Sequence, residues 1–215
     1  MIEGKFCCNA PSPKVRLRRQ QVTEAARRLF IANGFHATGI AQIAKESGVA
    51  VGQLYRDFAA KEDIVAAIVN TDCRSFMAAD SLRLAIERGD ADEVREWIHL
   101  FVTEEPDDDG GERLFAEIIA EAGRNERVAA IFNGIHEDVR ALMLEALAML
   151  APGDSLVSRR AAAADTILTM SLGLMHHRLI RSGADLVGLA GSLTKIIDRE
   201  IESLLTAAHG EATTS

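Results

Sequence analysis

The sequence predicts an all-α protein of about nine helices. Apolar residues recur at the three- and four-residue spacing of amphipathic helices along most of the chain. No segment shows the sustained alternation of apolar and polar residues that indicates a strand, and clusters rich in glycine, proline and aspartate separate the apolar stretches. The chain has 215 residues, of which 48% are apolar and 26% charged. This is an ordinary globular composition with ample material for a buried core.

Two short helices joined at a glycine are predicted between residues 38 and 61. The first ends at Gly48, where a residue without a Cβ adopts a positive φ at low cost, and its apolar stripe consists of Ile40, Ile43 and Ala44. The second covers residues 51–58 and has Leu54 and Phe58 on one inward face. This pattern is typical of a helix-turn-helix, whose second helix lies in the major groove of DNA. On pattern alone, an ordinary helical hairpin is the alternative.

The residues around this pattern follow a longer one without a gap. They are Ala25, Ala26, Leu29, Phe30, Gly34, Phe35, Thr38, Ile43, Ala44, Gly48, Val49, Gly52, Leu54, Tyr55, Phe58, Lys61 and Glu62. With these residues, the chain from 18 to 64 resembles the N-terminal domain of the TetR family of transcriptional regulators. The resemblance implies a helix-turn-helix domain that is released from DNA when a small molecule occupies a C-terminal domain. Beyond residue 64 it extends only to the overall plan.

Three regions are expected along the chain. A flexible tail covers residues 1–13, which lack periodicity and contain two prolines. The DNA-binding domain covers 14–64 and begins with a helix over 15–33, and a ligand-binding and dimerisation domain covers 65–215. One long helix over 61–88 joins the two domains, and by the resemblance its tilt is the lever of regulation. The other helices are predicted over 91–104, 112–122, 126–150, 156–181 and 185–208.

Charge is divided unequally between the two domains. Residues 1–64 carry ten Lys/Arg and six Asp/Glu, a net of +4, whereas residues 65–215 carry fourteen and twenty-six, a net of −12. The overall charge of −8 therefore does not argue against nucleic-acid binding, because the basic end can meet phosphates. A basic lead-in to the first helix can also reach a phosphate or the minor groove. It consists of Lys14, Arg16, Arg18 and Arg19.

The residue types on the second short helix indicate which groups contact DNA. Gln53 can pair with adenine through two hydrogen bonds, and Arg56 can pair with guanine or a phosphate. Val51 can meet a thymine methyl group, and Gly52 allows a close backbone approach. The expected phosphate anchors are Tyr55, Lys61 and, by the resemblance, Thr38. Base contacts specify the sequence and phosphate contacts orient the protein, so the operator sequence should depend on Val51, Gln53 and Arg56.

Three residues depart from the usual pattern of the family. Gly39 and Ala50 each replace a capping side chain at the start of a short helix, although Gln42 keeps the third position of a capping box. Asp57 places a carboxylate near phosphates, which would repel it. It therefore either accepts a hydrogen bond from a cytosine amino group, pairs with a neighbouring cation, or points away from DNA.

The C-terminal domain offers candidates for a ligand pocket and for a dimer interface. The large apolar residues that can line a pocket are Trp97, Phe101, Phe115, Phe132, Met143 and Met175, and they favour an apolar or amphipathic ligand. The last two predicted helices are long and amphipathic, so two subunits can form a four-helix interface. Its candidates are Leu168, Leu172, Leu179, Leu189, Leu193, Ile196, Ile197 and Leu204. Such a homodimer would present two recognition helices to a two-fold operator.

The sequence offers few other candidates for a metal, redox or catalytic site. Cys7 and Cys8 invite a redox or metal-sensing hypothesis, but no third ligand accompanies them, and we expect neither a metal nor a cofactor. No apolar run reaches a membrane span and no signal sequence is present, so we expect a cytoplasmic protein. A dimeric, ligand-responsive repressor is the function predicted. The alternatives are a nucleic-acid-binding protein indifferent to sequence, and an all-helical enzyme using His176 or His177 with a carboxylate.

Overall fold

The computed structural model describes residues 12–104, 110–181 and 185–212, except the side chains of residues 73–77, 211 and 212. Regular structure in these ranges is entirely helical, which confirms the predicted fold class. Cys7, Cys8 and nearly all of the predicted tail lie outside the described residues. The elements are α1 (Pro13–Asn33), α2 (Ile40–Ser47), α3 (Val51–Asp57), α4 (Lys61–Met77), α5 (Ala79–Arg88), α6 (Ala91–Thr103), α7 (Gly111–Ala122), α8 (Glu126–Leu150), a 3₁₀ turn (Asp154–Leu156), α9 (Val157–Ile180) and α10 (Leu186–Ala212).

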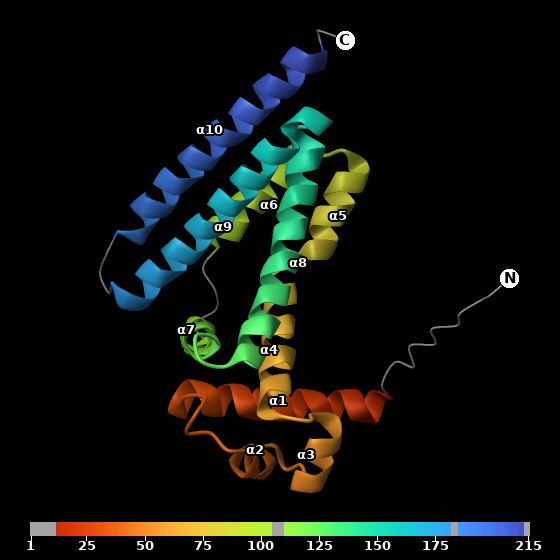
Figure 1. The fold of residues 1–215 in the computed structure, drawn as a ribbon, viewed down its shortest axis with the longest axis vertical. Helices are drawn as coiled ribbons and strands as arrows, with labels where there is room; N and C mark the ends of the chain where they lie inside the picture. The colour runs from red at the N-terminus through yellow and green to blue at the C-terminus, as the bar shows by residue number, and fades with distance from the viewer. Residues whose placement is uncertain (1–11, 105–109, 182–184, 213–215) are drawn as a thin grey trace, which may run out of the picture.

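Helices α1, α2 and α3 form a three-helix unit at one end of the molecule. Figure 1 shows α2 and α3 on the side of α1 that faces away from the other helices. Phe30 of α1, Ile43 of α2 and Leu54 of α3 are fully buried in one cluster, together with Phe58, which is 1% exposed. The apolar stripes read from the sequence therefore do meet in a shared core.

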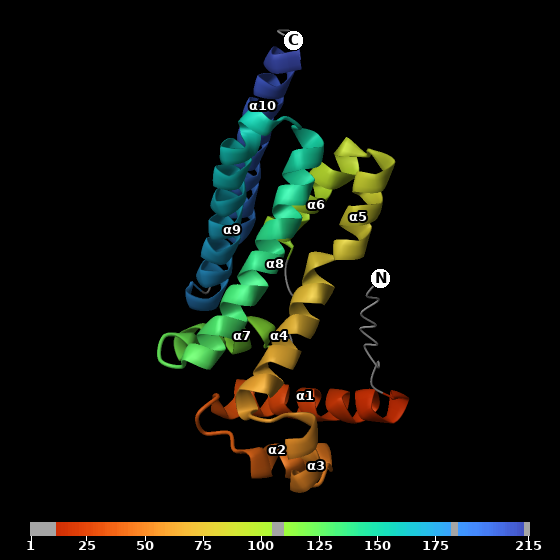
Figure 2. The same cartoon turned by 45° about the vertical axis from the view of Figure 1, so that its right-hand side comes forward.

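The predicted helix over residues 61–88 is wrong as a single element. It breaks into α4 and α5 at Ala78, which adopts a left-handed conformation with φ 42°, and Figure 2 shows the chain changing direction there. For this reason the described residues contain ten α-helices rather than about nine. Neither glycine nor proline marks the break, so the sequence carried no signal for it.

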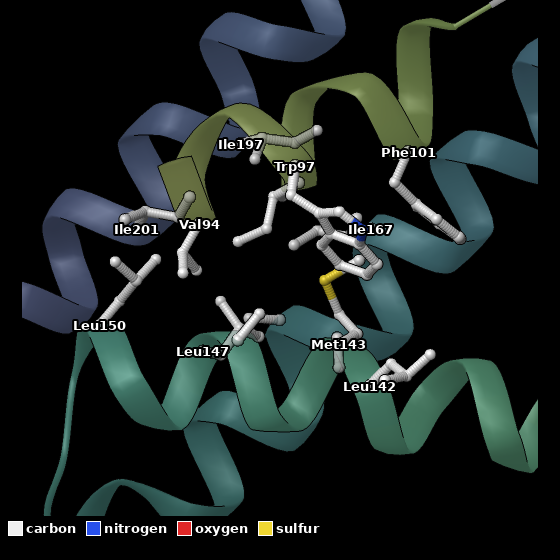
Figure 3. Packing of buried hydrophobic residues seen from close by; sticks show 14 of the residues in the cluster. Val94, Trp97, Phe101, Leu142, Met143, Leu147, Leu150, Ile167, Ile197 and Ile201 are labelled. Atoms are coloured by element: carbon white, nitrogen blue, oxygen red, sulfur yellow. The ribbon is translucent and has the colours of Figure 1, made fainter. Parts of the chain in front are cut away.

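A second bundle surrounds a core at the other end of the molecule. Helices α5, α6, α8, α9 and α10 contribute to it, and Figure 3 shows Trp97 of α6 pointing between Met143 of α8 and Ile167 of α9. Met143 is fully buried, and Ile167 and Ile197 are each 1% exposed. Among the described residues, no helix combines the length and the apolar composition that a membrane span requires.

The core of the three-helix unit does not stop at residue 64. Ile68 of α4 belongs to it, and so do Leu114 and Ile118 of α7 and Val128 of α8. Helix α7 therefore packs directly on the helix-turn-helix unit, next to α4 (Figures 1 and 2). Helices α4 and α7 both contact the three-helix unit, which was expected to be joined through one connecting helix.

The strained residue between α4 and α5 gives a stability prediction. A non-glycine residue in the left-handed region costs about 1 kcal/mol or more, so Ala78→Gly should raise the free energy of unfolding by about 1 kcal/mol. Ala141→Gly, at an exposed site within α8, should lower it by about 1 kcal/mol. Urea denaturation measures both changes. A loss of stability in Ala78→Gly would contradict the backbone conformation described here.

Candidate nucleic-acid interface

The turn between α2 and α3 has the geometry of a helix-turn-helix. Gly48 ends α2 with φ 69°, and the Val49 amide donates a hydrogen bond to the Ala44 carbonyl at 3.2 Å. Val49 is 9% exposed and packs into the shared core, so it fixes the angle between the two helices. At the start of α2 the Gly39 amide donates to Gln42 Oε1 at 2.7 Å, which is the half of a capping box that a glycine permits.

The outer face of α3 carries the side chains expected to meet DNA. Val51 and Tyr55 expose 44% and 54% of their surface, and Gly52 and Arg56 are also exposed. Gln53 is half-buried, and its Oε1 accepts a hydrogen bond from Arg56 Nη1 at 3.2 Å. Leu54 is the buried residue of α3, so the opposite face of the helix is exposed.

Asp57 pairs with a cation, which is one of the three placements considered for it. Arg18 of α1 donates from Nε to Asp57 Oδ2 at 2.5 Å and from Nη2 to Oδ1 at 2.8 Å. The Asp57 side chain is only 7% exposed. The Arg18 hydrogen bonds, opposed by burial, hold the pKa of the Asp57 carboxyl below its ordinary value. Arg18 and Asp57 are 39 residues apart, so no local pattern could have predicted the pair.

Two of the expected phosphate anchors are turned inward. Thr38 is fully buried, and its hydroxyl donates to the carbonyls of Gly34 at 2.9 Å and Leu29 at 3.2 Å. Lys61 Nζ donates to the carbonyls of Phe35 at 2.6 Å and Thr38 at 3.0 Å. The expected side-chain role of Thr38 at a phosphate is therefore wrong, because its hydroxyl ties α1 to α2.

Lys61 serves the same turn from the start of α4. Its ammonium also lies 3.9 Å from the centre of the Phe35 ring. Burial lowers the pKa of Lys61, while the charges of Glu62 and Glu121 oppose that shift. The ammonium thus closes the α1–α2 turn instead of pointing outward to a phosphate.

A hollow of about 400 Å³ lies between the start of α1 and the start of α3. Lys14 and Arg18 are the cations in its lining, which also includes the turn residues 48–50 and Gln53. Leu17 in the same lining is 58% exposed. Lys14 is thus a cation that could meet a DNA phosphate at this hollow. The basic lead-in seen in the sequence therefore lies beside the start of α3.

A buried carboxylate joins α7 to the helix-turn-helix unit. Glu121 is 2% exposed, and its Oε2 lies 2.6 Å from His36 Nε2, in the α1–α2 turn, and accepts from Arg124 Nε at 2.8 Å. Asn125 Nδ2 donates to Glu121 Oε1 at 3.2 Å and to Glu62 Oε1 at 3.1 Å. Burial, the largest effect, raises the pKa of Glu121, but the hydrogen bonds from Arg124 and Asn125 and the His36 charge together lower it.

The sequence did not indicate this contact between α7 and the α1–α2 turn. Residues 123–125 lie between two predicted helices. Asn125 is a recognisable N-cap, and its side chain accepts hydrogen bonds from the amides of Arg127 and Val128. A second contact lies beside it, where Arg127 pairs with Asp63 at the start of α4. The sequence could have suggested the cap, but not the helix it would face.

The six pocket candidates do not share one location. Trp97, Phe101 and Met143 belong to the C-terminal core, where the Trp97 and Phe101 rings stack with centroids 5.7 Å apart. The ring centroids of Phe115 and Phe132 are 5.0 Å apart, and Phe132 packs against the core shared with α1. Met175 is half-buried on α9. The six residues stay separate candidates for lining a pocket.

The dimer candidates also divide into two groups. Leu168, Ile197 and Leu204 are 4%, 1% and 1% exposed within the core of their own chain. Their assignment to a dimer interface is wrong, because Leu168 of α9 and Ile197 and Leu204 of α10 face the core of their own bundle. Leu172 and Ile196 are 41% and 45% exposed. The half-buried members are Leu179, Leu189 and Leu193.

The fold and this surface define a helix-turn-helix protein with a helical second domain. Residues 22–68 match the family model described as bacterial regulatory proteins, tetR family. The N-terminal part of the chain is therefore similar to the DNA-binding domain of the TetR family of transcriptional regulators.

Individual regulators and solved structures are also similar to this chain. The transcriptional regulator UidR of Escherichia coli K12 is 32% identical over 118 residues, which is 55% of this chain and 58% of UidR. The match therefore spans less than two thirds of that relative. The solved structure of Salmonella enterica GusR has 25% identity and a TM-score of 0.64, covering 92% of this chain and 98% of GusR. A putative regulator from Pseudomonas aeruginosa PAO1 has 19% identity and a TM-score of 0.69, over 94% and 96% of the two chains, and shows the same fold.

Thr38→Val tests the inward role of the hydroxyl. Valine keeps the shape but leaves two buried carbonyls with one donor fewer, so the free energy of unfolding should fall by about 1–2 kcal/mol. Thr71→Val is the control, because the Thr71 hydroxyl bonds only within its own helix at an exposed site and should change stability by less than about 0.5 kcal/mol. Urea denaturation of both variants provides the comparison. If Thr38→Val were as stable as the unaltered chain, the inward role of the hydroxyl would be contradicted, and a phosphate contact by Thr38 would again be the expectation.

Glu121→Gln tests the contact between α7 and the α1–α2 turn through its pH dependence. At pH 7 the variant should lose about 1–3 kcal/mol of unfolding free energy, because hydrogen bonds to a buried carboxylate are removed. The folded state lowers the Glu121 pKa from its ordinary value of 4.5. The stabilisation is therefore present above pH 4.5 and is lost as the pH falls through the lowered pKa.

The difference between Glu121→Gln and the unaltered chain should accordingly shrink below pH 4.5. Glu145→Gln is the matched control, since Glu145 is 49% exposed and 3.8 Å from Arg83, and it should differ little from the unaltered chain at any pH. Denaturation midpoints between pH 3 and pH 7 give the measurement. A pH-independent deficit in Glu121→Gln would show that the carboxylate charge is not what joins α7 to the turn.

Proposed function

We propose that this chain is a transcriptional regulator that reads a specific operator through the outer face of α3. The observation that carries the proposal is the exposure of Val51, Tyr55 and Arg56 on a helix whose inner face is buried. Gln53 and Arg56 supply the two side-chain types that read adenine and guanine in the major groove. Lys14 and the α2–α3 turn lie beside them as groups for the phosphate backbone.

The proposed active species is a homodimer. Helices α9 and α10 pack side by side at one edge of the C-terminal bundle (Figures 1 and 2). Val187, Ile196 and Leu172 expose 80%, 45% and 41% of their surface there. Gly173 and Gly191 are exposed on the same helices, with nothing within 4 Å of where a Cβ would lie. Small and apolar residues of this kind let helices of two subunits approach closely.

A small molecule is the proposed effector, with DNA release and therefore repression as the outcome. The C-terminal core is rich in apolar groups such as Trp97, Phe101 and Met143, which supports an apolar or amphipathic ligand. Its occupation would reach the operator-binding unit through α4 and α7, since both helices pack on that unit. A coupling of about 1–3 kcal/mol is typical of such regulation.

Binding of the full chain to its own upstream DNA tests this function. Gln53→Ala and Arg56→Ala should each weaken binding to that DNA by about 1–3 kcal/mol, or roughly 5- to 150-fold. Affinity for random DNA should change much less, because phosphates dominate it. Fluorescence anisotropy at several salt concentrations gives both affinities. Arg88→Ala is the control, because Arg88 lies on α5 and pairs with Glu93 in the second domain.

The proposal is wrong if the unaltered chain binds random and upstream DNA equally. That result would instead favour the nucleic-acid-binding protein indifferent to sequence. It is also wrong if both α3 variants bind upstream DNA as tightly as the unaltered chain.

A further inference from the structure

Asp57, the last residue of α3, lies where two electrostatic effects disfavour a negative charge. A carboxylate near DNA repels phosphates, and a negative group in the last turn of a helix opposes the helix dipole. Asp57 occupies this place and is nearly buried, with 7% of its side chain exposed. Its charge is compensated inside the protein, because Arg18 of α1 holds the carboxylate through two hydrogen bonds of 2.5 and 2.8 Å.

Helix α3 needs such an attachment because it is short. It has seven residues, and Leu54 is its one buried residue, so local helix formation contributes little to its position. A guanidinium and a carboxylate joined at two points fix both distance and orientation. Arg19 adds a third attachment at the same end, since it donates to the Asp57 carbonyl and its guanidinium lies 4.1 Å from the Phe58 ring centre.

The attachment continues into the side chains that face DNA. Gln53 Nε2 donates a long hydrogen bond of 3.4 Å to Asp57 Oδ1. The other end of the same amide, Oε1, accepts from Arg56 Nη1 at 3.2 Å. One chain of hydrogen bonds therefore runs from Arg18 on α1 through Asp57 to Gln53 and Arg56. It determines which end of the Gln53 amide faces which neighbour.

We propose that Asp57 is a positioning residue for base recognition, which uses Arg18 to hold Gln53 and Arg56 in the orientation that reads bases. The inference rests on the proposed function. It also implies a compromise, because Arg18 lines the hollow beside α3 but its charge is committed to Asp57 and not to a phosphate. The Arg18–Asp57 pair therefore increases selectivity for particular bases and lowers the affinity for DNA of any sequence.

Asp57→Asn separates these two quantities because it keeps the shape and removes the charge. Random DNA should bind more tightly, and the slope of log affinity against log salt should steepen by about 1 as Arg18 becomes available to a phosphate. The ratio of operator to random affinity should fall by roughly five- to tenfold. A purely structural role would weaken binding to both DNAs and would not steepen the slope.

The loss should act through Gln53. Single base-pair changes across the operator first locate the positions where Gln53→Ala and Arg56→Ala lose discrimination. Asp57→Asn should lose discrimination at those same positions. In the double variant with Gln53→Ala, the ratio of operator to random affinity should be less than twofold lower than in Gln53→Ala alone. The effects of two residues that act as a unit are not additive.

Glu46→Gln is the matched control. Glu46 pairs with Arg28 of α1 at 3.2 Å, and both side chains are exposed. The variant removes one negative charge from the same domain without touching α3, so it should leave the base preferences and the operator-to-random ratio unchanged. If Asp57→Asn does not fold, as judged by circular dichroism, Arg18→Lys takes its place. That variant keeps the cation but loses the two-point contact, and should lower discrimination at the Gln53 positions with the salt slope unchanged.

The inference is overturned if the variant used keeps the operator-to-random ratio, or if its loss is spread evenly over the operator. It is also overturned if the effects of Asp57→Asn and Gln53→Ala simply add. These outcomes leave the proposed function standing, because the unaltered chain would still prefer its operator. An unaltered chain without any such preference would remove the proposed function and this inference together.

Discussion

The seven-residue helix α3 cannot hold itself in place, and the rest of the N-terminal unit follows from that constraint. Its inner side chain, Leu54, and the following Phe58 are buried in a core that α1 supplies through Val22, Ala26 and Phe30. Ion pairing at its C-terminal end then fixes its rotation. Helix α1 therefore holds α3 in place, and under the proposed function it sets the orientation of the face that reads bases.

The second domain reaches this support by two routes. Helix α4 begins beside the α1–α2 turn, which the Lys61 ammonium closes, and α7 ends against the same turn through Glu121. The break at Ala78 separates α4 from α5, so α4 is not one rigid lever across the molecule. Under the proposed function, a ligand that shifts α6, α8 or α9 would be felt through α7 as much as through α4.

Much of the fold followed from local patterns, and the misses share a physical reason. The glycine turn at Gly48 and the apolar stripes around it needed only nearest-neighbour information, because helix spacing and positive φ are local properties. An amphipathic stripe shows that a face is buried but not against what, which is why Ile197 and Leu204 were assigned to a dimer and lie in their own core. Arg18 with Asp57, and His36 with Glu121, meet only after folding.

Selection of bound sequences from random DNA with the full chain tests the central claim most directly. A homodimer that reads DNA with one α3 face per subunit should enrich a two-fold symmetric site. The half-sites should be separated by about one helical turn, roughly 34–36 Å, or a multiple of it. Enrichment of a single asymmetric site would contradict the dimer, and no enrichment at all would contradict sequence recognition by α3.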